Sequence, residues 1–317
     1  MSPKCPQVIF GSGFFGNAEP FISDAGLEAT YDLISKYGIS RLDSAQLYGE
    51  SERRLGETKS GDRFSIDTKW LMGWGPGTGT KDGIVVGAKE SVRKIGCVVD
   101  VFYLHCPDAS IAVEDTLAGV NEAYKLGLFK RFGLSNYPTE EVVKIFDHCK
   151  AQGYVLPTVF QGNYAPVARK LETLLLPTLR KLGISFYAYS PLAGGFLTKT
   201  KWQITEGAGR FNTNHMGGMY HQIYLKESYL NALADWEDIA REQGCSRGEL
   251  AYRWVAYHGA LEAECGDGII IGASKFEQIE PTLQGLQKGR LKDTVAKRID
   301  QLWGTVKHEA PMDAFAK

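Results

Sequence analysis

Short apolar stretches rich in β-branched residues alternate along the chain with longer segments whose apolar residues recur at helical spacing, as in Leu27, Tyr31 and Ile34. Strand alternating with helix predicts right-handed βαβ crossovers and a parallel sheet. Eight such units in one run predict a (β/α)8 TIM barrel of class α/β rather than two smaller domains. The eight expected strands are Gln7–Phe10, Arg41–Ala45, Phe64–Thr68, Val99–His105, Phe129–Ser135, Thr158–Gln161, Ser185–Ser190 and Gly268–Gly272.

Two segments depart from this alternation. Residues 191–225, after the seventh expected strand, are rich in Gly, Asn, Thr and aromatic residues and predict a long structureless loop. Loops of that length inside a domain are uncommon and are usually functional, so we expect a lid over substrate and cofactor. Residues 291–308 predict one extra C-terminal helix. We therefore expect residues 1–317 to form a single barrel domain with these two additions.

The charge balance and the cysteines narrow the class of protein. The chain has 36 Lys and Arg against 37 Asp and Glu, which argues against a nucleic-acid partner or an anionic membrane surface and favours a small substrate. The six cysteines are scattered without metal-ligand spacing, so we expect reduced thiols and no metal site. No signal peptide and no membrane-spanning stretch is evident, which predicts a cytoplasmic protein.

Residues 11–16 read GSGFFG and match a dinucleotide-binding fingerprint that follows an expected strand. That fingerprint should open a helix at once, so that a pyrophosphate sits on the helix N-terminus. Here Asn17–Pro20 intervene and the first helix is expected only near Asp24. We favour a glycine-rich first loop above the barrel, with a Rossmann-type dehydrogenase as the alternative.

Polar residues gather where the second, third and fourth expected strands end, the face on which barrel enzymes place their sites. Asp43, Tyr48, Lys69 and His105 lie there. Each taken alone has an ordinary structural explanation, such as a helix cap, a surface lysine or a hydrogen-bonded histidine. Strand alternation turns Asp43 and Lys69 toward the lumen, where a charge is costly unless paired, so we expect an Asp43–Lys69 ion pair.

The chain resembles the aldo-keto reductase superfamily over essentially its whole length, and is most similar to the group that includes the aflatoxin-aldehyde reductases. The resemblance rests on the motifs DSAQLYGESERRLG, DTKW, YLHCPD, GLSNY, QGNY, YAYSPLAGGFLT and IIIGASKFEQ. It implies a barrel enzyme that reduces an aldehyde or ketone to an alcohol with a nicotinamide cofactor. It also implies a catalytic tetrad of Asp43, Tyr48, Lys69 and His105.

The chemistry of these residue types fits that role. A tyrosine with its ordinary pKa near ~10 donates a proton poorly at neutral pH. The Lys69 ammonium is expected to lower the pKa of Tyr48 and make it a better general acid, while Asp43 orients Lys69. His105 is expected to hydrogen-bond the carbonyl oxygen and stabilise the charge that develops on it.

The resemblance also implies a cofactor site at the ends of the later strands. Ser135, Asn136 and Gln161 are expected to hold the nicotinamide amide, and Tyr189 to stack on its ring. The anion site expected at Gly272, Ser274 and Lys275 favours NADPH over NADH. Residues expected to approach the phosphates or the adenosine are Ser190, Leu192, Gly194, Gly195 and Gln278, with Arg210 as a second phosphate contact, a lid contact or a simple surface residue.

The match to the resembled family is incomplete in two places. Many relatives carry an arginine where this chain has Gln278, and an acid–Asn pair in place of Pro281 and Thr282. His221 and Ile223 stand where relatives that reduce carboxylate-bearing aldehydes present arginines. We hypothesise that neutral, flat or aromatic carbonyls are preferred. The expected pocket walls are Phe14, Phe15, Trp70, Met219, Tyr220 and Tyr224.

Two further questions stay open at this point. Some members of the resembled superfamily are weakly catalytic, redox-sensing subunits that bind the cofactor, and an intact tetrad does not exclude that role. A homodimer is compatible with the near-neutral charge but is not demonstrated by it.

Overall fold

Eight parallel strands close into a barrel in which each strand pairs with its neighbours in chain order and β8 returns to β1. The computed structural model describes residues 5–72, 74–214 and 218–313. Every expected strand is present with its ends within two residues of the expectation, so the predicted (β/α)8 barrel is confirmed. The strands are β1 Gln7–Gly11, β2 Arg41–Asp43, β3 Ser65–Trp70, β4 Val99–Leu104, β5 Phe129–Ser135, β6 Pro157–Asn163, β7 Ser185–Tyr189 and β8 Gly268–Ile271.

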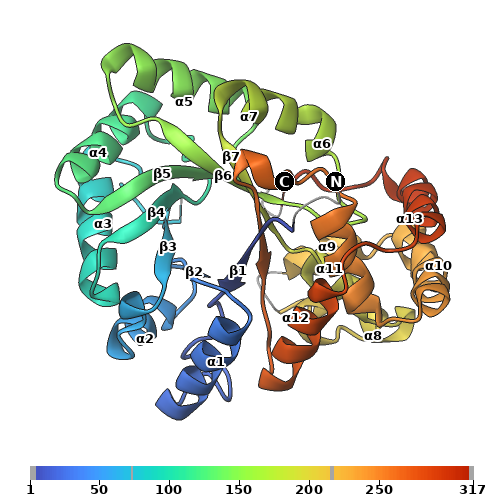
Figure 1. The fold of residues 1–317 in the computed structure, drawn as a ribbon. Coiled ribbons are helices and arrows are strands. Elements are labelled where there is room, and N and C mark those ends of the chain that lie inside the picture. The colour runs from blue at the N-terminus through green and yellow to red at the C-terminus, as the bar shows by residue number, and fades with distance from the viewer. Residues whose placement is uncertain (1–4, 73, 215–217, 314–317) are drawn as a thin grey trace.

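Helices surround the barrel as an outer ring (Figure 1). Glycine in the left-handed conformation follows the helices at Gly38, Gly127 and Gly183, because this residue carries no Cβ to clash there. The helices are α1 Asp24–Lys36, α2 Ser51–Glu57, α3 Lys81–Ile95, α4 Val113–Lys125, α5 Thr139–Gln152, α6 Leu171–Leu174, α7 Leu176–Leu182, α8 Lys201–Thr205, α9 Met219–Tyr224, α10 Glu227–Gln243, α11 Arg247–Tyr257, α12 Ile279–Gln287 and α13 Asp293–Val306.

The glycine-rich segment after β1 does not open a helix. Turns continue to Ser23, whose hydroxyl accepts the Gly26 amide at 3.1 Å and caps α1. The helix therefore begins at Asp24, as expected, and the closed barrel excludes the Rossmann alternative.

The expectation of a structureless loop at 191–225 is wrong for its described part. Two short α-helices, α8 and α9, and the 3-10 turns Ala193–Thr198 and Gly209–Phe211 occupy it. Thr200 and Gln203 form a reciprocal capping box that starts α8, a local signal that composition alone hides. Residues 215–217 lie outside the described residues, and both the lid role of the segment and the single-domain boundary at 1–317 stay predictions.

The expected C-terminal helix is α13, which packs beside α10 at the right of Figure 1. Between strands and helices lies one large apolar core, and the lumen holds a second, smaller cluster that includes Ile9, Val101, Tyr103 and Tyr187. The lumen is thus filled by side chains, which places any ligand site at the mouth of the barrel. In the described part of the chain no helix has the length and apolar content needed to cross a membrane.

Candidate active site

The predicted ion pair is present at the ends of β2 and β3. Lys69 Nζ lies 2.6 Å from Asp43 Oδ2 and also donates to the Ser44 carbonyl at 2.7 Å. Gln161 Nε2 donates to Asp43 Oδ1 at 2.8 Å, so both carboxylate oxygens are used. Asp43 is 3% exposed and Lys69 0%, and these partners are what a buried charged pair requires.

Tyr48 and His105 complete the cluster. Tyr48 lies in the loop between β2 and α2, and Lys69 Nζ sits 4.8 Å from the centre of its ring. The His105 ring, just after β4, lies edge-on to Tyr48 with the ring centres 6.1 Å apart. Four residues from three strand ends therefore meet, as the strand positions indicate.

The pKa of Tyr48 departs from the expectation. Burial raises the pKa of Tyr48, and the Lys69 ammonium lowers it by less, so the net shift is upward rather than downward. The sequence indicates the Lys69 cation but not the loss of hydration that the Tyr48 hydroxyl undergoes on burial. Tyr48 therefore stays protonated throughout the neutral range, which is the state a proton donor needs.

The same environment keeps Lys69 charged and His105 neutral. Burial by itself would lower the pKa of Lys69, but Asp43 and Tyr48 outweigh it and the net shift is upward. Burial, helped by the nearby Lys69 charge, lowers the pKa of His105 to about 3. At neutral pH the cluster thus holds one ammonium and a neutral imidazole.

Hydrogen bonds join the expected nicotinamide residues Asn136, Ser135 and Tyr189 to this cluster. Asn136 Nδ2 donates to the His105 carbonyl at 2.9 Å and lies 3.0 Å from Ser135 Oγ. Tyr189 OH donates to Asn136 Oδ1 at 2.7 Å. These contacts bring the ends of β4, β5 and β7 together, next to the Asp43–Gln161 contact.

Left-handed backbone conformations concentrate beside these residues. Asn136, Ser190 and Ala193 have φ of 60°, 54° and 52°, values that are unusual for residues other than glycine. Strain of this kind gathers at ligand-binding turns. Leu192 is half-buried in the same turn, and a Cβ on Gly194 would lie 2.3 Å from the Tyr220 ring, so only glycine fits there.

The expected phosphate site at the end of β8 already has an internal partner. Gln278 Oε1 accepts the backbone amides of Ser274 at 3.0 Å and Lys275 at 3.1 Å, and the Ser274 hydroxyl at 3.2 Å. Gly272 lies just before them. A phosphate bound by these donors would have to replace the Gln278 oxygen.

Three expected pocket residues, Phe14, Met219 and Tyr220, lie near Arg210. The Arg210 guanidinium carbon is 5.8 Å from the centre of the Phe14 ring and 5.5 Å from that of Tyr220, and Nη1 is 3.3 Å from the Tyr220 hydroxyl. Met219 is half-buried beside Tyr220. Arg210 thus connects the loop after β1 to the 191–225 segment.

The other three expected pocket walls, Phe15, Trp70 and Tyr224, pack elsewhere. Phe15 is in the core against other aromatic rings. Trp70 follows the inward-pointing Lys69 and so faces outward onto α3, where a Cβ on Gly87 would lie 2.3 Å from its ring. Tyr224 stacks on Phe196. Hydrophobic type alone does not distinguish a core ring from a pocket wall, and the place of these three rings in a pocket wall stays a prediction.

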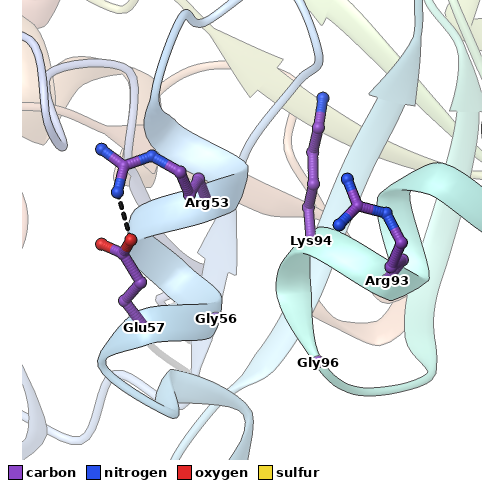
Figure 2. A pocket seen from close by; sticks show the side chains of 6 residues that line it. All are labelled: Arg53, Gly56, Glu57, Arg93, Lys94 and Gly96. Carbon is purple, nitrogen blue, oxygen red and sulfur yellow. Dashed lines mark hydrogen bonds and ion pairs between the residues drawn. The ribbon is translucent and has the colours of Figure 1, made fainter.

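A hollow of about 380 Å³ lies elsewhere, between the ends of α2 and α3 that precede β3 and β4. Figure 2 shows Arg53 and Glu57, which pair with each other, on α2, and Arg93 and Lys94 on the neighbouring α3. Arg53 pairs with Glu57, and Arg93 and Lys94 pair with Glu90, so its cations are already neutralised. The hollow lies at the opposite end of the barrel from Tyr48.

Two features of the site were not singled out from the sequence. The Ser44 carbonyl holds Lys69, and a backbone acceptor leaves no side-chain signal. Arg41 Nη1 donates to Asp67 Oδ1 at 2.6 Å in a second buried contact, and the strand alternation that points Asp43 and Lys69 inward could have identified it. Among the described residues, no group of three or more His, Cys, Asp and Glu side chains could hold a metal ion, and the cysteines are free.

Comparison with known proteins identifies relatives over nearly the whole chain. The model of the aldo/keto reductase family matches residues 7–304. The oxidoreductase sirO of Leptosphaeria maculans is 38% identical over 98% of this chain and 97% of its own length. Aflatoxin B1 aldehyde reductase member 2 of Mus musculus is 39% identical over 98% of this chain and 88% of its own. The human aldo-keto reductase family 7 member A3 is 37% identical, with 98% of both chains covered.

The depressed pKa of His105 makes a prediction for stability. A histidine neutral in the fold but protonated when unfolded destabilises the fold as pH falls below its unfolded pKa of ~6.5. The His105→Gln variant should therefore lose less stability than the wild type between pH 7 and pH 4, by roughly 2–3 kcal/mol. Urea unfolding at the two pH values measures this, and equal losses in both proteins would contradict a buried neutral His105.

Proposed function

Because the chain belongs to the aldo/keto reductase family and is an NAD(P)H-dependent oxidoreductase, we propose that it reduces an aldehyde or ketone to an alcohol with NADPH, with Tyr48 as general acid. One observation carries the proposal. The buried Asp43–Lys69 pair, 2.6 Å apart, places an ammonium 4.8 Å from the centre of the Tyr48 ring, beside a neutral His105.

In the proposed reaction, the bound cofactor supplies the hydride that adds to the carbonyl carbon. Tyr48 donates its proton to the carbonyl oxygen as negative charge develops there. Lys69 stabilises the phenolate that Tyr48 becomes, and Asp43 keeps Lys69 charged and in place. His105 is neutral, so it stabilises the oxygen as a hydrogen-bond donor rather than as a cation.

The residues at the strand ends suit a nicotinamide cofactor. Ser135, Asn136 and Gln161 offer buried donors and acceptors for an amide, and Tyr189 offers a ring beside them. The left-handed turn at Ser190, with Leu192, Gly194 and Gly195, presents backbone amides that suit phosphates.

We assign the 2′-phosphate of NADPH to Ser274 and Lys275 at the end of β8, where two backbone amides and a hydroxyl converge and Lys275 supplies a positive charge. The Gln278 oxygen occupies the same donors and is the group that the phosphate replaces. Arg210, placed between Phe14 and Tyr220, is assigned to closing the barrel mouth.

We propose neutral, flat or aromatic carbonyls as the substrate class. Phe14, Tyr220 and Met219 supply an apolar wall near Arg210, and the guanidinium is already placed against the two rings. The mouse relative is named an aflatoxin B1 aldehyde reductase, which is in keeping with such a substrate. A cytoplasmic location and a homodimer stay predictions.

Tyr48→Phe tests the assignment of the acid. It removes the transferable proton and keeps the ring, so kcat should fall by about 10²–10⁴-fold, the usual contribution of general acid catalysis. The cofactor Kd should stay within about twofold of the wild-type value, because the expected cofactor contacts lie on other residues. Stopped-flow turnover and fluorescence titration with NADPH measure the two quantities.

Tyr124→Phe, at an exposed position on α4, is the matched control and should keep wild-type turnover. Turnover of Tyr48→Phe near that of the wild type would remove Tyr48 from the mechanism. A wild-type protein that binds NADPH tightly but reduces no aldehyde would instead support the redox-sensing role.

A substrate panel run with both cofactors tests the finer proposals. The KM for 4-nitrobenzaldehyde should lie below that for succinic semialdehyde. The reason is that the Arg210 guanidinium already lies against the Phe14 and Tyr220 rings and is not assigned to a substrate carboxylate. The kcat/KM should be at least about tenfold higher with NADPH than with NADH, because NADH lacks the 2′-phosphate and so loses one charged contact at Ser274 and Lys275. The reverse order of KM, or equal use of both cofactors, would contradict these two assignments separately.

A further inference from the structure

A second ionic group lies in the barrel lumen, toward the end where the strands begin. Arg41 Nη1 donates to Asp67 Oδ1 at 2.6 Å and also pairs with Asp100. Arg131 Nη2 donates to Asp100 Oδ2 at 3.0 Å and lies 3.4 Å from the Tyr187 hydroxyl. We call this set, with Tyr103, the lumen cluster; it comprises Arg41, Asp67, Asp100, Tyr103, Arg131 and Tyr187.

The lumen cluster runs from solvent into the barrel. The Arg131 side chain is 32% exposed and that of Asp100 is 14% exposed, whereas that of Asp67 is fully buried. Asp67 also accepts the Val101 backbone amide at 3.1 Å. The proposed function uses none of these residues, so their role needs a separate explanation.

Three buried polar atoms of this cluster have no hydrogen-bond partner among the described residues. They are Asp67 Oδ2, the Tyr103 hydroxyl and Arg41 Nε. Buried polar groups are rarely left in this state, because the loss of hydration is not offset. A proton on Asp67 Oδ2 removes the negative charge of this buried carboxylate and so lowers the cost of burying it.

Asp67 is adjacent to the catalytic pair. It precedes Lys69 by two residues on β3 and so faces the same side, and it is the cross-strand partner of Asp43. Tyr103 is the cross-strand partner of Lys69, with its ring centre 6.0 Å from Nζ. The lumen cluster therefore lies directly under the Asp43–Lys69 pair.

Two neighbouring carboxylates in a dry lumen resist simultaneous ionisation. Asp43 is held as a carboxylate by Lys69 and Gln161, so the proton belongs on Asp67. Burial raises the pKa of Asp67 to about 7, opposed by Arg41 and reinforced by Asp43 and Asp100. The charge of Asp67 thus changes in the range where the enzyme is expected to work.

We propose that Asp67 is a positioning residue for the carbonyl reduction: it keeps a proton beneath the catalytic pair, so that Asp43 alone carries the negative charge that fixes Lys69 beside Tyr48. The inference rests on the proposed function. When Asp67 ionises, the added negative charge favours the protonated form of Tyr48 and makes it a weaker acid, so reduction slows on the alkaline side.

The other groups that face Asp67 set the background of this titration. They are Arg41 and Asp43 from β2, Lys69 from β3, Asp100 and Tyr103 from β4, Arg131 from β5 and Tyr187 from β7. The pKa values of Arg41, Lys69, Tyr103 and Arg131 are raised and that of Asp100 is lowered, so these five groups keep their charge states near pH 7.

The location of the proton can be measured without turnover. Isotope-edited infrared spectra of full-length protein labelled with ¹³C-carboxyl aspartate should contain a protonated carboxyl band that disappears with a midpoint near pH 7. Aspartate labelling leaves out Glu52, whose pKa burial also raises. The band should be absent in Asp67→Asn and present in Asp100→Asn, the matched control in the same cluster. No such band in the wild type would overturn the proposal.

The effect on catalysis is measured by pH profiles of the same proteins. Between pH 6 and pH 8 the wild-type kcat/KM should fall by about tenfold. This is the effect expected if ionised Asp67 raises the pKa of Tyr48 by about one unit. The kcat/KM should change by less than about twofold in Asp67→Asn, whereas Asp100→Asn should keep a fall that is displaced to lower pH, because it removes a charge that raises the pKa of Asp67. A wild-type slope in Asp67→Asn would overturn the positioning role.

Two further outcomes keep the tests distinct. If Asp67→Asn does not fold, Arg41→Gln should move the infrared midpoint to higher pH, because it removes the cation that favours the carboxylate; an unchanged midpoint would overturn the assignment of the band. Absence of any carbonyl reduction by the wild type would overturn the proposed function and the positioning role together, while the infrared midpoint would still decide where the proton lies.

Discussion

The buried Asp43–Lys69 ion pair is the interaction on which the rest of the site depends. Removing two charges from water carries a large penalty, and a short contact repays it only when the remaining donors and acceptors are satisfied. The Ser44 carbonyl and the Gln161 amide meet that need. Losing one partner of such a pair usually costs about 3–5 kcal/mol, because it leaves an uncompensated buried charge. The barrel therefore places an ammonium beside Tyr48 only by fixing the ends of β2, β3 and β6 together.

The same dry environment sets the charge of every neighbour. Burial keeps Tyr48 protonated and His105 neutral, whereas Asp43 keeps Lys69 charged. The result is a site with one mobile proton next to one fixed cation, which suits proton donation to a developing oxyanion. The lumen cluster extends this effect toward the beginnings of the strands, because burial raises the pKa of the Asp67 carboxyl to about 7.

Strand periodicity made most of the fold and the Asp43–Lys69 pair predictable from the sequence, whereas the tetrad as a catalytic set rests on the family resemblance. Eight apolar runs gave the barrel, and alternation placed Asp43 and Lys69 on one inward face. The features that the sequence did not predict are those that depend on three-dimensional packing. Phe15, Trp70 and Tyr224 are aromatic like pocket residues but face the core, and the upward pKa shift of Tyr48 needs its burial to be known. The Gln278 oxygen on the Ser274 and Lys275 amides is a local contact that no residue pattern reveals.

The most direct test of the central claim is a double-mutant cycle on kcat with Asp43→Asn, Lys69→Met and the combined variant. If the pair acts as one unit that serves Tyr48, the double variant should lose no more activity than the worse single variant. Circular dichroism and NADPH titration establish that each variant is folded and binds cofactor. Losses that multiply in the double variant would contradict the account, because Asp43 and Lys69 would then act independently.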